Sequence, residues 1–135
     1  MKKEYIEIVK YRMEKAKITL TDAKKFFKNV SLDSTVNRIY YALFYAVNAL
    51  LLCEGVFSSK HSGVRALFDK VFIKKGIVKK EMGRFYSEMF DRRLKGDYRD
   101  FVKFDDKDVK IWIKKAEDFI KEIEDLLEDR YLKGE

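Results

Sequence analysis

Basic and acidic side chains gather in the segment from Arg92 to Arg99, which reads RRLKGDYR. The planar guanidinium of arginine suits bidentate phosphate binding, so Arg92 and Arg93 are candidate phosphate-binding residues. An ion pair between Arg93 and Asp97 that clamps the end of a helix explains the same residues equally well. The sequence leaves both interpretations open.

A second polar group interrupts the most apolar stretch of the chain. Asn37 and Arg38 stand there with Tyr41, and the four-residue spacing of Asn37 and Tyr41 places them on one face of a helix. Buried polar groups need hydrogen-bond partners, so this face predicts a specific polar network or a binding site. The alternative is that the tyrosines only pack, with their hydroxyls at the rim of the core.

His61, in the turn SSKHSG, is the single histidine of the sequence. A lone histidine can act as a general base, but it more often caps a helix or forms a hydrogen bond in a loop. The sequence shows no glycine-rich phosphate loop, nucleophile elbow or cluster of metal ligands, so we expect no cofactor and no metal. The single cysteine, Cys53, cannot form an internal disulfide, which favours a reducing compartment.

The helical spacing of apolar residues predicts the elements that position these side chains. The first expected helix covers Lys3 to Lys28, and the second runs from a cap at Ser31 or Asp33 to about Glu54. The third covers Ser62 to Lys74, the fourth covers Lys79 to Leu94, and the fifth begins after a cap at Asp105 or Asp106. A polar turn and a short extended piece, GDYRDFVKF, are expected between the last two. Gly55, Gly76 and Gly96 are expected to end the second, third and fourth helices. The absence of proline fits long helices with short loops. We therefore predict an all-α fold, an up-and-down antiparallel helical bundle of about five helices in a single domain, 1–135.

Charge and composition limit the possible partners. The 135 residues carry a net charge of +7, with 47% hydrophobic and 39% charged residues. A basic surface can attract RNA, DNA, nucleotides or an acidic protein. Lysine and glutamate are heavily interspersed, however, so the charge can also serve solubility alone.

The second expected helix carries apolar residues on nearly every face. A monomer of this size cannot easily cover all of them, so we expect a homodimer. The apolar run from Ile39 to Cys53 is shorter than the ~18–20 residues that span a bilayer, and the N-terminus is charged throughout. We therefore expect a cytoplasmic protein with no membrane contact.

Two segments, NRIYYALFYAVNALLLCEGVFSSKHSG and FDRRLKGDYRDF, resemble the HEPN family (higher eukaryotes and prokaryotes nucleotide-binding). The likeness spans roughly Val36 to Phe104. Its matching pieces are the N-R-x-Y-Y-A-x-F-Y-A run, the K-H-S-G turn and the R-x-x-G-D-Y turn. The resemblance implies a HEPN-like helical bundle that forms homodimers. It also implies a minimal nucleotidyltransferase as partner, in a two-component system that often behaves as toxin and antitoxin.

Some HEPN proteins are metal-independent endoribonucleases, whose motif is an arginine followed, after four to six residues, by a histidine. This chain departs from that motif, because Asp97 stands where the histidine is expected and His61 lies far upstream. Aspartate is ionised at neutral pH and would repel phosphate, so it is a poor substitute. Arg93 or Arg92 carries over as the phosphate-binding candidate, and the histidine role carries over to no residue. Tyr98 matches a tyrosine that the partner enzyme modifies with nucleotide in some relatives.

Three hypotheses follow. The first is a homodimeric binding module for a minimal nucleotidyltransferase, with nucleotide or RNA as a further ligand. Its phosphate-binding candidates are Asn37, Arg38, Arg93, Asp97 and Tyr98, with Tyr41 and His61 as further candidates. The second is a metal-independent endoribonuclease that uses Arg92 or Arg93 together with Asp97, Tyr98 or His61, which the missing histidine of the motif disfavours. The third is a purely structural helical dimer.

Overall fold

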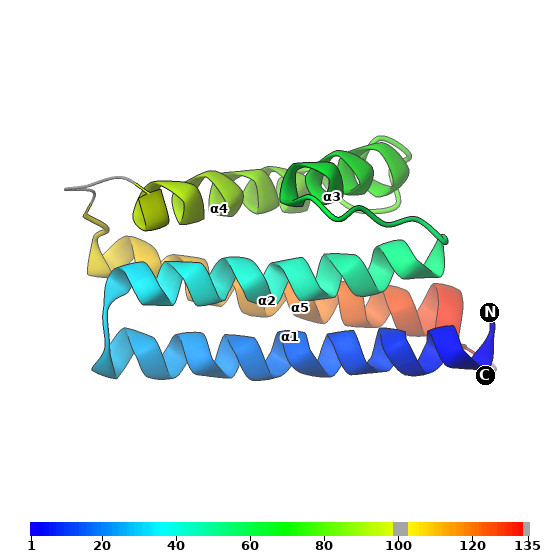
Figure 1. The fold of residues 1–135 in the computed structure, drawn as a ribbon, viewed down its shortest axis with the longest axis horizontal. Helices are drawn as coiled ribbons and strands as arrows, with labels where there is room; N and C mark the ends of the chain where they lie inside the picture. Colours follow the sequence, from blue (N-terminus) through cyan, green and yellow to red (C-terminus); the bar gives the residue numbers. More distant parts are fainter. Residues whose placement is uncertain (99–102, 134–135) are drawn as a thin grey trace.

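A computed structural model describes residues 1–98 and 103–133 of the chain. Over these residues the chain forms five α-helices and no strand, which confirms the all-α prediction. The helices are α1 (Lys3–Asn29), α2 (Leu32–Cys53), α3 (His61–Phe68), α4 (Lys80–Tyr98) and α5 (Asp106–Leu127). Two π-helical segments, η1 (Asp69–Ile73) and η2 (Glu128–Leu132), extend α3 and α5. The four long helices run up and down beside one another, and the short α3 lies beside the start of α4 (Figure 1).

Most helix ends coincide with the local signals in the sequence. The Ser31 hydroxyl accepts a hydrogen bond from the Ser34 amide, and Asp105 accepts one from the Lys107 amide, so both residues cap a helix as predicted. Gly55 and Gly76 adopt φ values of +69° and +76° just after α2 and η1. Other residues adopt this left-handed backbone only at a steric cost, so these glycines end their helices.

The predicted end of the fourth helix is wrong. We expected it to stop at Leu94 before Gly96, but α4 continues through Gly96 to Tyr98. Gly96 instead provides room for Phe104, since a Cβ added at Gly96 would lie 3.0 Å from the Phe104 ring. The expected turn therefore becomes two more residues of helix after Gly96. The following piece, which we expected to be extended, falls partly on residues 99–102, outside the described residues.

The second helix is the centre of the bundle. It contacts α1, α4 and α5. Eleven of its side chains, from Thr35 to Leu51, are buried, among them Ile39, Leu43 and Leu50. Of the described helices, α2 alone has the length and hydropathy to cross a bilayer, but packing in the core accounts for that apolarity. One stripe of α2 remains half-exposed and consists of Tyr41, Phe44, Tyr45, Asn48 and Leu52.

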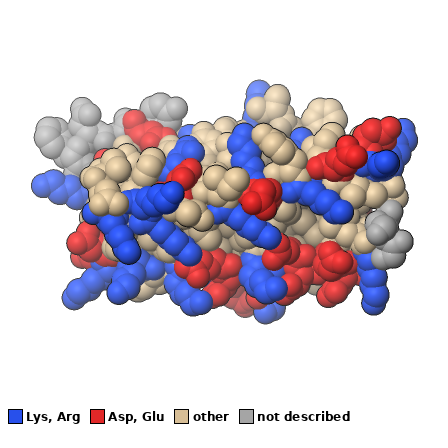
Figure 2. Space-filling model, turned by 90° about the horizontal axis from the view of Figure 1, so that it is seen from below, with Lys and Arg blue, Asp and Glu red and all other residues tan. Residues whose placement is uncertain are grey.

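Charged side chains join α1 to α5 on the opposite side of the bundle from α4. Lys17 pairs with Glu124, and Lys24 pairs with Glu117 at 3.1 Å. Basic and acidic side chains are mixed over the face on which α1 lies (Figure 2). This face therefore shows no large area of one charge.

Candidate functional site

Arg93 is a buried cation on the face of α4 that packs against α2. Its side chain is only 7% exposed, and its guanidinium carbon lies 4.9 Å from the centre of the Tyr40 ring. The rings of Tyr41 and Phe90 follow at 5.8 Å each. Aromatic faces attract a cation, so the three rings hold the guanidinium at a fixed place between the helices.

Hydrogen bonds connect Arg93 to the polar end of α2. Asp97 lies one turn beyond Arg93, with its Oδ2 3.8 Å from Nη1 of Arg93. Asn37 donates from Nδ2 to the same Oδ2 at 3.2 Å, and Arg38 donates from Nη2 to Oδ1 of Asn37 at 2.8 Å. Arg38 also lies over the Tyr41 ring at 5.2 Å. The two polar groups that the sequence presents separately thus form one network.

Arg93 has an unused donor in this network. Its Nε is buried and has no hydrogen-bond partner among the described residues. Native structures rarely leave such a donor unsatisfied, and an anionic oxygen is the acceptor that a guanidinium binds most strongly. The network contains two cations, Arg38 and Arg93, and one anion, Asp97, so its net charge is positive by one. The arrangement can therefore accept a phosphate.

His61 joins the same group of aromatic rings, although it is far from Arg93 in sequence. It is the first residue of α3, and its Nδ1 lies 2.8 Å from the Tyr40 hydroxyl. Its ring centre lies 5.6 Å from those of both Tyr40 and Tyr41, the two tyrosines under Arg93. Partial burial lowers the pKa of His61, and the Arg93 charge lowers it further. The imidazole is therefore mainly neutral at pH 7.

Sequence reasoning missed two features of this arrangement. It did not connect Tyr40 with Arg93, and it offered His61 as a partner of Arg93 only as one of three alternatives. The signal for Tyr40 was its position beside Tyr41 in the apolar helix, but the direction of its hydroxyl depends on how α3 packs. Burial raises the pKa of Tyr40, so its hydroxyl remains protonated at neutral pH.

The sequence pattern of the HEPN domain matches residues 9–131. The chain belongs to the HEPN domain family. A UPF0332 protein of Thermotoga maritima is 53% identical to this HEPN protein over 91% of this chain and 93% of its own length. A protein of Methanocaldococcus jannaschii named "Putative toxin MJ0142" is 32% identical over 91% of this chain and 84% of its own length. A second protein of that organism, named "Putative toxin MJ0605", is 33% identical over 73% of each chain.

Arg92 is not part of the site in this HEPN protein. Its guanidinium carbon lies 4.1 Å from the Trp112 ring centre on α5, and its Nη2 pairs with Glu88 at 3.4 Å. Successive residues of a helix point about 100° apart, so Arg92 and Arg93 face different neighbours. Of the two arginines that the sequence offers, only Arg93 belongs to the polar network. Tyr98 is the last residue of α4, and its side chain lies outside the described residues.

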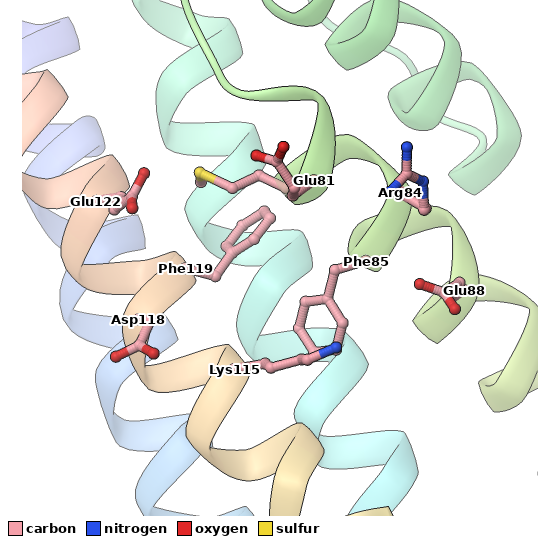
Figure 3. Close-up of a pocket in the computed structure, with 9 residues that line it drawn as sticks. Glu81, Arg84, Phe85, Glu88, Lys115, Asp118, Phe119 and Glu122 are labelled. Carbon is pink, nitrogen blue, oxygen red and sulfur yellow. The ribbon is translucent and has the colours of Figure 1, made fainter.

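A separate pocket of about 270 Å³ lies between α4 and α5 of this HEPN protein. Phe85 and Phe119 extend into it from the two helices, among charged side chains (Figure 3). Its carboxylates are Glu81, Glu88, Asp118 and Glu122. They would repel phosphate, and none of the predicted site residues lines this pocket. Within residues 1–98 and 103–133, no group of three or more histidine, cysteine or acidic side chains is arranged to hold a metal ion.

Proposed function

We propose that this HEPN protein is the toxin-like member of a two-component pair. In this proposal it is a homodimeric module that binds a nucleotide or RNA phosphate at Arg93 and engages a minimal nucleotidyltransferase. The observation that carries the proposal is the buried Arg93 guanidinium with its unused Nε donor. The two archaeal relatives that are named as toxins support the toxin-like role.

The network around Arg93 suits reversible phosphate binding. Asp97 stabilises the guanidinium when the site is empty, and at 3.8 Å its carboxylate forms a loose ion pair. An incoming phosphate offers several oxygens, so it can replace part of the contact between Asp97 and the guanidinium. It can also accept from Nε once the side chains that cover this buried atom move apart. Arg38 and Asn37 lie beside this position and can supply further donors. In a purely structural ion pair, we would expect more of the guanidinium N–H groups of Arg93 to have hydrogen-bond partners.

The half-exposed stripe of α2 supports a homodimer. It continues onto α1 through the Lys15 ammonium, which lies 4.6 Å from the Tyr45 ring centre, and through Arg12, which donates to the Asn48 carbonyl. Beside these contacts, Tyr11 is 66% exposed and Ile18 is 55% exposed. A second copy paired along α2 would cover this apolar area. Because the stripe begins at Tyr41, such pairing would also bring two Arg93 sites to one interface.

Phosphate binding is tested by titrating the protein with AMP and ATP in a calorimeter. We expect Arg93→Gln to weaken binding at least tenfold, and Arg130→Gln, which removes an arginine from η2, to leave it unchanged. Because Arg93 is buried, its replacement can also disturb packing. Arg38→Gln is therefore the second site variant, at a residue that is less buried. Equal affinities in the wild type and in both site variants would refute the phosphate site.

The partner is tested by co-expressing the chain with the product of a neighbouring nucleotidyltransferase gene. We expect the two proteins to co-purify as a stable complex. The oligomeric state of the chain alone is measured by light scattering, with a Tyr11→Glu/Ile18→Glu variant expected to be monomeric. Absence of such a gene and of any complex would remove the partner from the proposal, and a monomeric wild type would remove the dimer.

The position of His61 favours one second candidate, a metal-independent endoribonuclease. In the tautomer whose Nδ1–H donates to the Tyr40 hydroxyl, Nε2 of His61 is free to take the proton of a ribose 2′-hydroxyl. The 2′-oxygen then bonds to phosphorus, and the 5′-oxygen leaves and takes a proton from water. Mixed RNA incubated with the protein in EDTA tests this. We expect cleavage that both Arg93→Gln and His61→Gln abolish, and no cleavage by the wild type would exclude the candidate.

A further inference from the structure

Tyr40 is completely buried, so its hydroxyl must find its hydrogen-bond partners inside the protein. One partner is Nδ1 of His61, at 2.8 Å. The other is the hydroxyl of Tyr86, whose ring centre lies 5.8 Å from that of Tyr40. The three side chains thus form a chain of hydrogen-bonding groups that runs from α4 through α2 to the first residue of α3.

Tyr86 is the closed end of this chain. Its side chain is fully buried, and its hydroxyl has no partner of ordinary hydrogen-bond geometry among the described residues. The Tyr40 hydroxyl is the one group in the described part of the chain that forms even a loose hydrogen bond with it. A phenol donates its single proton and accepts through its oxygen. The Tyr86 proton can therefore only point to the Tyr40 oxygen.

The number of protons along the chain separates the two neutral tautomers of His61. With the imidazole proton on Nε2, Tyr86 donates to Tyr40, Tyr40 donates to Nδ1, and every buried donor has an acceptor. With the imidazole proton on Nδ1, three donors compete for two phenol oxygens, so one buried donor has no acceptor. Such a donor is costly enough to make the second tautomer the minor one by about fivefold or more.

The other ring nitrogen of His61 lies near Arg93. Nε2 has no hydrogen-bond partner within the described residues, and the side chain is partly exposed. The imidazole centre is 5.6 Å from the ring centres of both Tyr40 and Tyr41. The guanidinium carbon of Arg93 lies 4.9 and 5.8 Å from the same two centres. A second N–H donor is therefore available beside the same two rings as the guanidinium.

We propose that His61 donates a hydrogen bond from Nε2–H to an oxyanion bound at Arg93, and that Tyr40 is the positioning residue that holds the imidazole in this state. The tautomer is a property of the free protein, whereas the donor role rests on the proposed function, because it takes Arg93 as a phosphate site. A phosphate oxygen accepts from a guanidinium and from an imidazole N–H alike. A general base needs the opposite tautomer, with no proton on Nε2. The proton count therefore supports binding over cleavage.

The tautomer is measured on the wild type by two-bond ¹H–¹⁵N correlation NMR. The single histidine gives one set of imidazole signals, which report directly which nitrogen carries the proton. At roughly pH 8, above the ordinary pKa of histidine, we expect Nε2 to be protonated and Nδ1 to be unprotonated. This measurement needs no variant, so it does not depend on whether a substitution disturbs folding.

A matched pair of variants tests the role of Tyr40. Tyr40→Phe removes the hydrogen bond to Nδ1 and keeps the ring under Arg93. Because only the neutral imidazole can accept that hydrogen bond, its loss should raise the pKa of His61. Tyr86→Phe also removes one buried hydroxyl, but Nδ1 remains the acceptor for Tyr40, so the pKa of His61 should stay near its wild-type value. AMP binding should weaken about threefold to tenfold in Tyr40→Phe and stay within about twofold in Tyr86→Phe.

Addition of AMP tests the donor role directly. We expect the Nε2–H proton signal of His61 to move downfield when AMP binds, because the N–H then donates to a phosphate oxygen. Adenosine, which lacks the phosphate, should leave this signal in place.

Three results would overturn the inference. The first is a wild-type imidazole that is protonated on Nδ1, or on the two nitrogens in similar proportions. The second is an equal pKa of His61 in the two phenylalanine variants. The third is an Nε2–H signal that AMP does not move although Arg93→Gln weakens AMP binding, which would place the phosphate at Arg93 alone. If Arg93→Gln leaves AMP affinity unchanged, the proposed function fails instead, and the tautomer is still decided by the spectrum of the free protein.

Discussion

The Tyr40 hydroxyl lies 2.8 Å from Nδ1 of His61, and this contact joins α2 to α3 across 21 residues of sequence. The same Tyr40 ring supports the Arg93 guanidinium at 4.9 Å. One buried tyrosine thus positions a neutral imidazole and a permanent cation in the same part of the bundle. This combination is the basis for the binding proposal and for its ribonuclease alternative.

The pKa of His61 should lie below 6.5. Burial and the Arg93 charge both disfavour the imidazolium, so between the folded pKa and 6.5 the unfolded chain binds a proton that the folded protein does not. Acidification through this window should therefore lower the free energy of unfolding, and above it His61 should have no effect. As the single histidine, His61 gives one imidazole NMR titration. A midpoint at or above 6.5 would contradict this prediction. In the His61→Gln variant, the part of the pH dependence of the free energy of unfolding that comes from His61 should be absent.

Asp97→Asn should strengthen AMP binding several-fold. The substitution removes the carboxylate that competes with phosphate for Arg93, while an amide oxygen remains for Asn37. We expect the free energy of unfolding to fall by less than about 1 kcal/mol, because the ion pair is long and partly solvated. Calorimetry and thermal unfolding measure the two effects, with Asp118→Asn on α5 as a matched control. A large loss of stability with unchanged AMP affinity would instead support the purely structural hypothesis.

Cys53 should react slowly with alkylating reagents. Burial raises the pKa of its thiol to about 11, with a further contribution from Glu54. Compared with a thiol of pKa 9.0, this lowers the reactive thiolate at neutral pH by about a hundredfold. The measurement is the rate of iodoacetamide labelling by mass spectrometry. Denaturant should restore the ordinary rate, and fast labelling of the folded protein would show that the thiol is not shielded.

Gly96→Val should destabilise the fold by about 1–3 kcal/mol. A side chain at this position would collide with the Phe104 ring, which lies 3.0 Å from the position of an added Cβ. The cost should be smaller when Phe104 is replaced by alanine, because the ring is then absent. Chemical denaturation of both single variants and the double variant measures this coupling. If the two losses in the free energy of unfolding simply add in the double variant, Gly96 is needed in α4 for a reason other than the Phe104 ring.

Local signals made much of the fold predictable. Capping at Ser31 and Asp105 and the left-handed backbone at Gly55 and Gly76 depend on a few adjacent residues, so their sequence context is sufficient. Gly96 misled the prediction because its role depends on Phe104, which follows in another part of the fold. A glycine alone does not reveal whether it ends a helix or admits a neighbouring ring.

The candidate site was predictable as fragments and not as a whole. Asn37 and Arg38 stood out as polar residues in an apolar helix, and Arg93 and Asp97 as a charged pair. Their connection depends on the packing of α2 against α4, which no spacing along the chain specifies. His61 reaches Tyr40 because the chain reverses after α2, so sequence distance was a poor measure of proximity.

The ion pairs between α1 and α5 also determine the register of the two helices. Lys17 and Lys24 are seven residues apart, as are their partners Glu124 and Glu117, so the pairs mark two points of one antiparallel alignment. A slip of α5 by three residues would place Lys121 opposite Lys17 and Lys114 opposite Lys24. Both attractions would become repulsions between like charges. The charge pattern therefore selects one alignment of two apolar helix faces that could otherwise slide past each other by a turn.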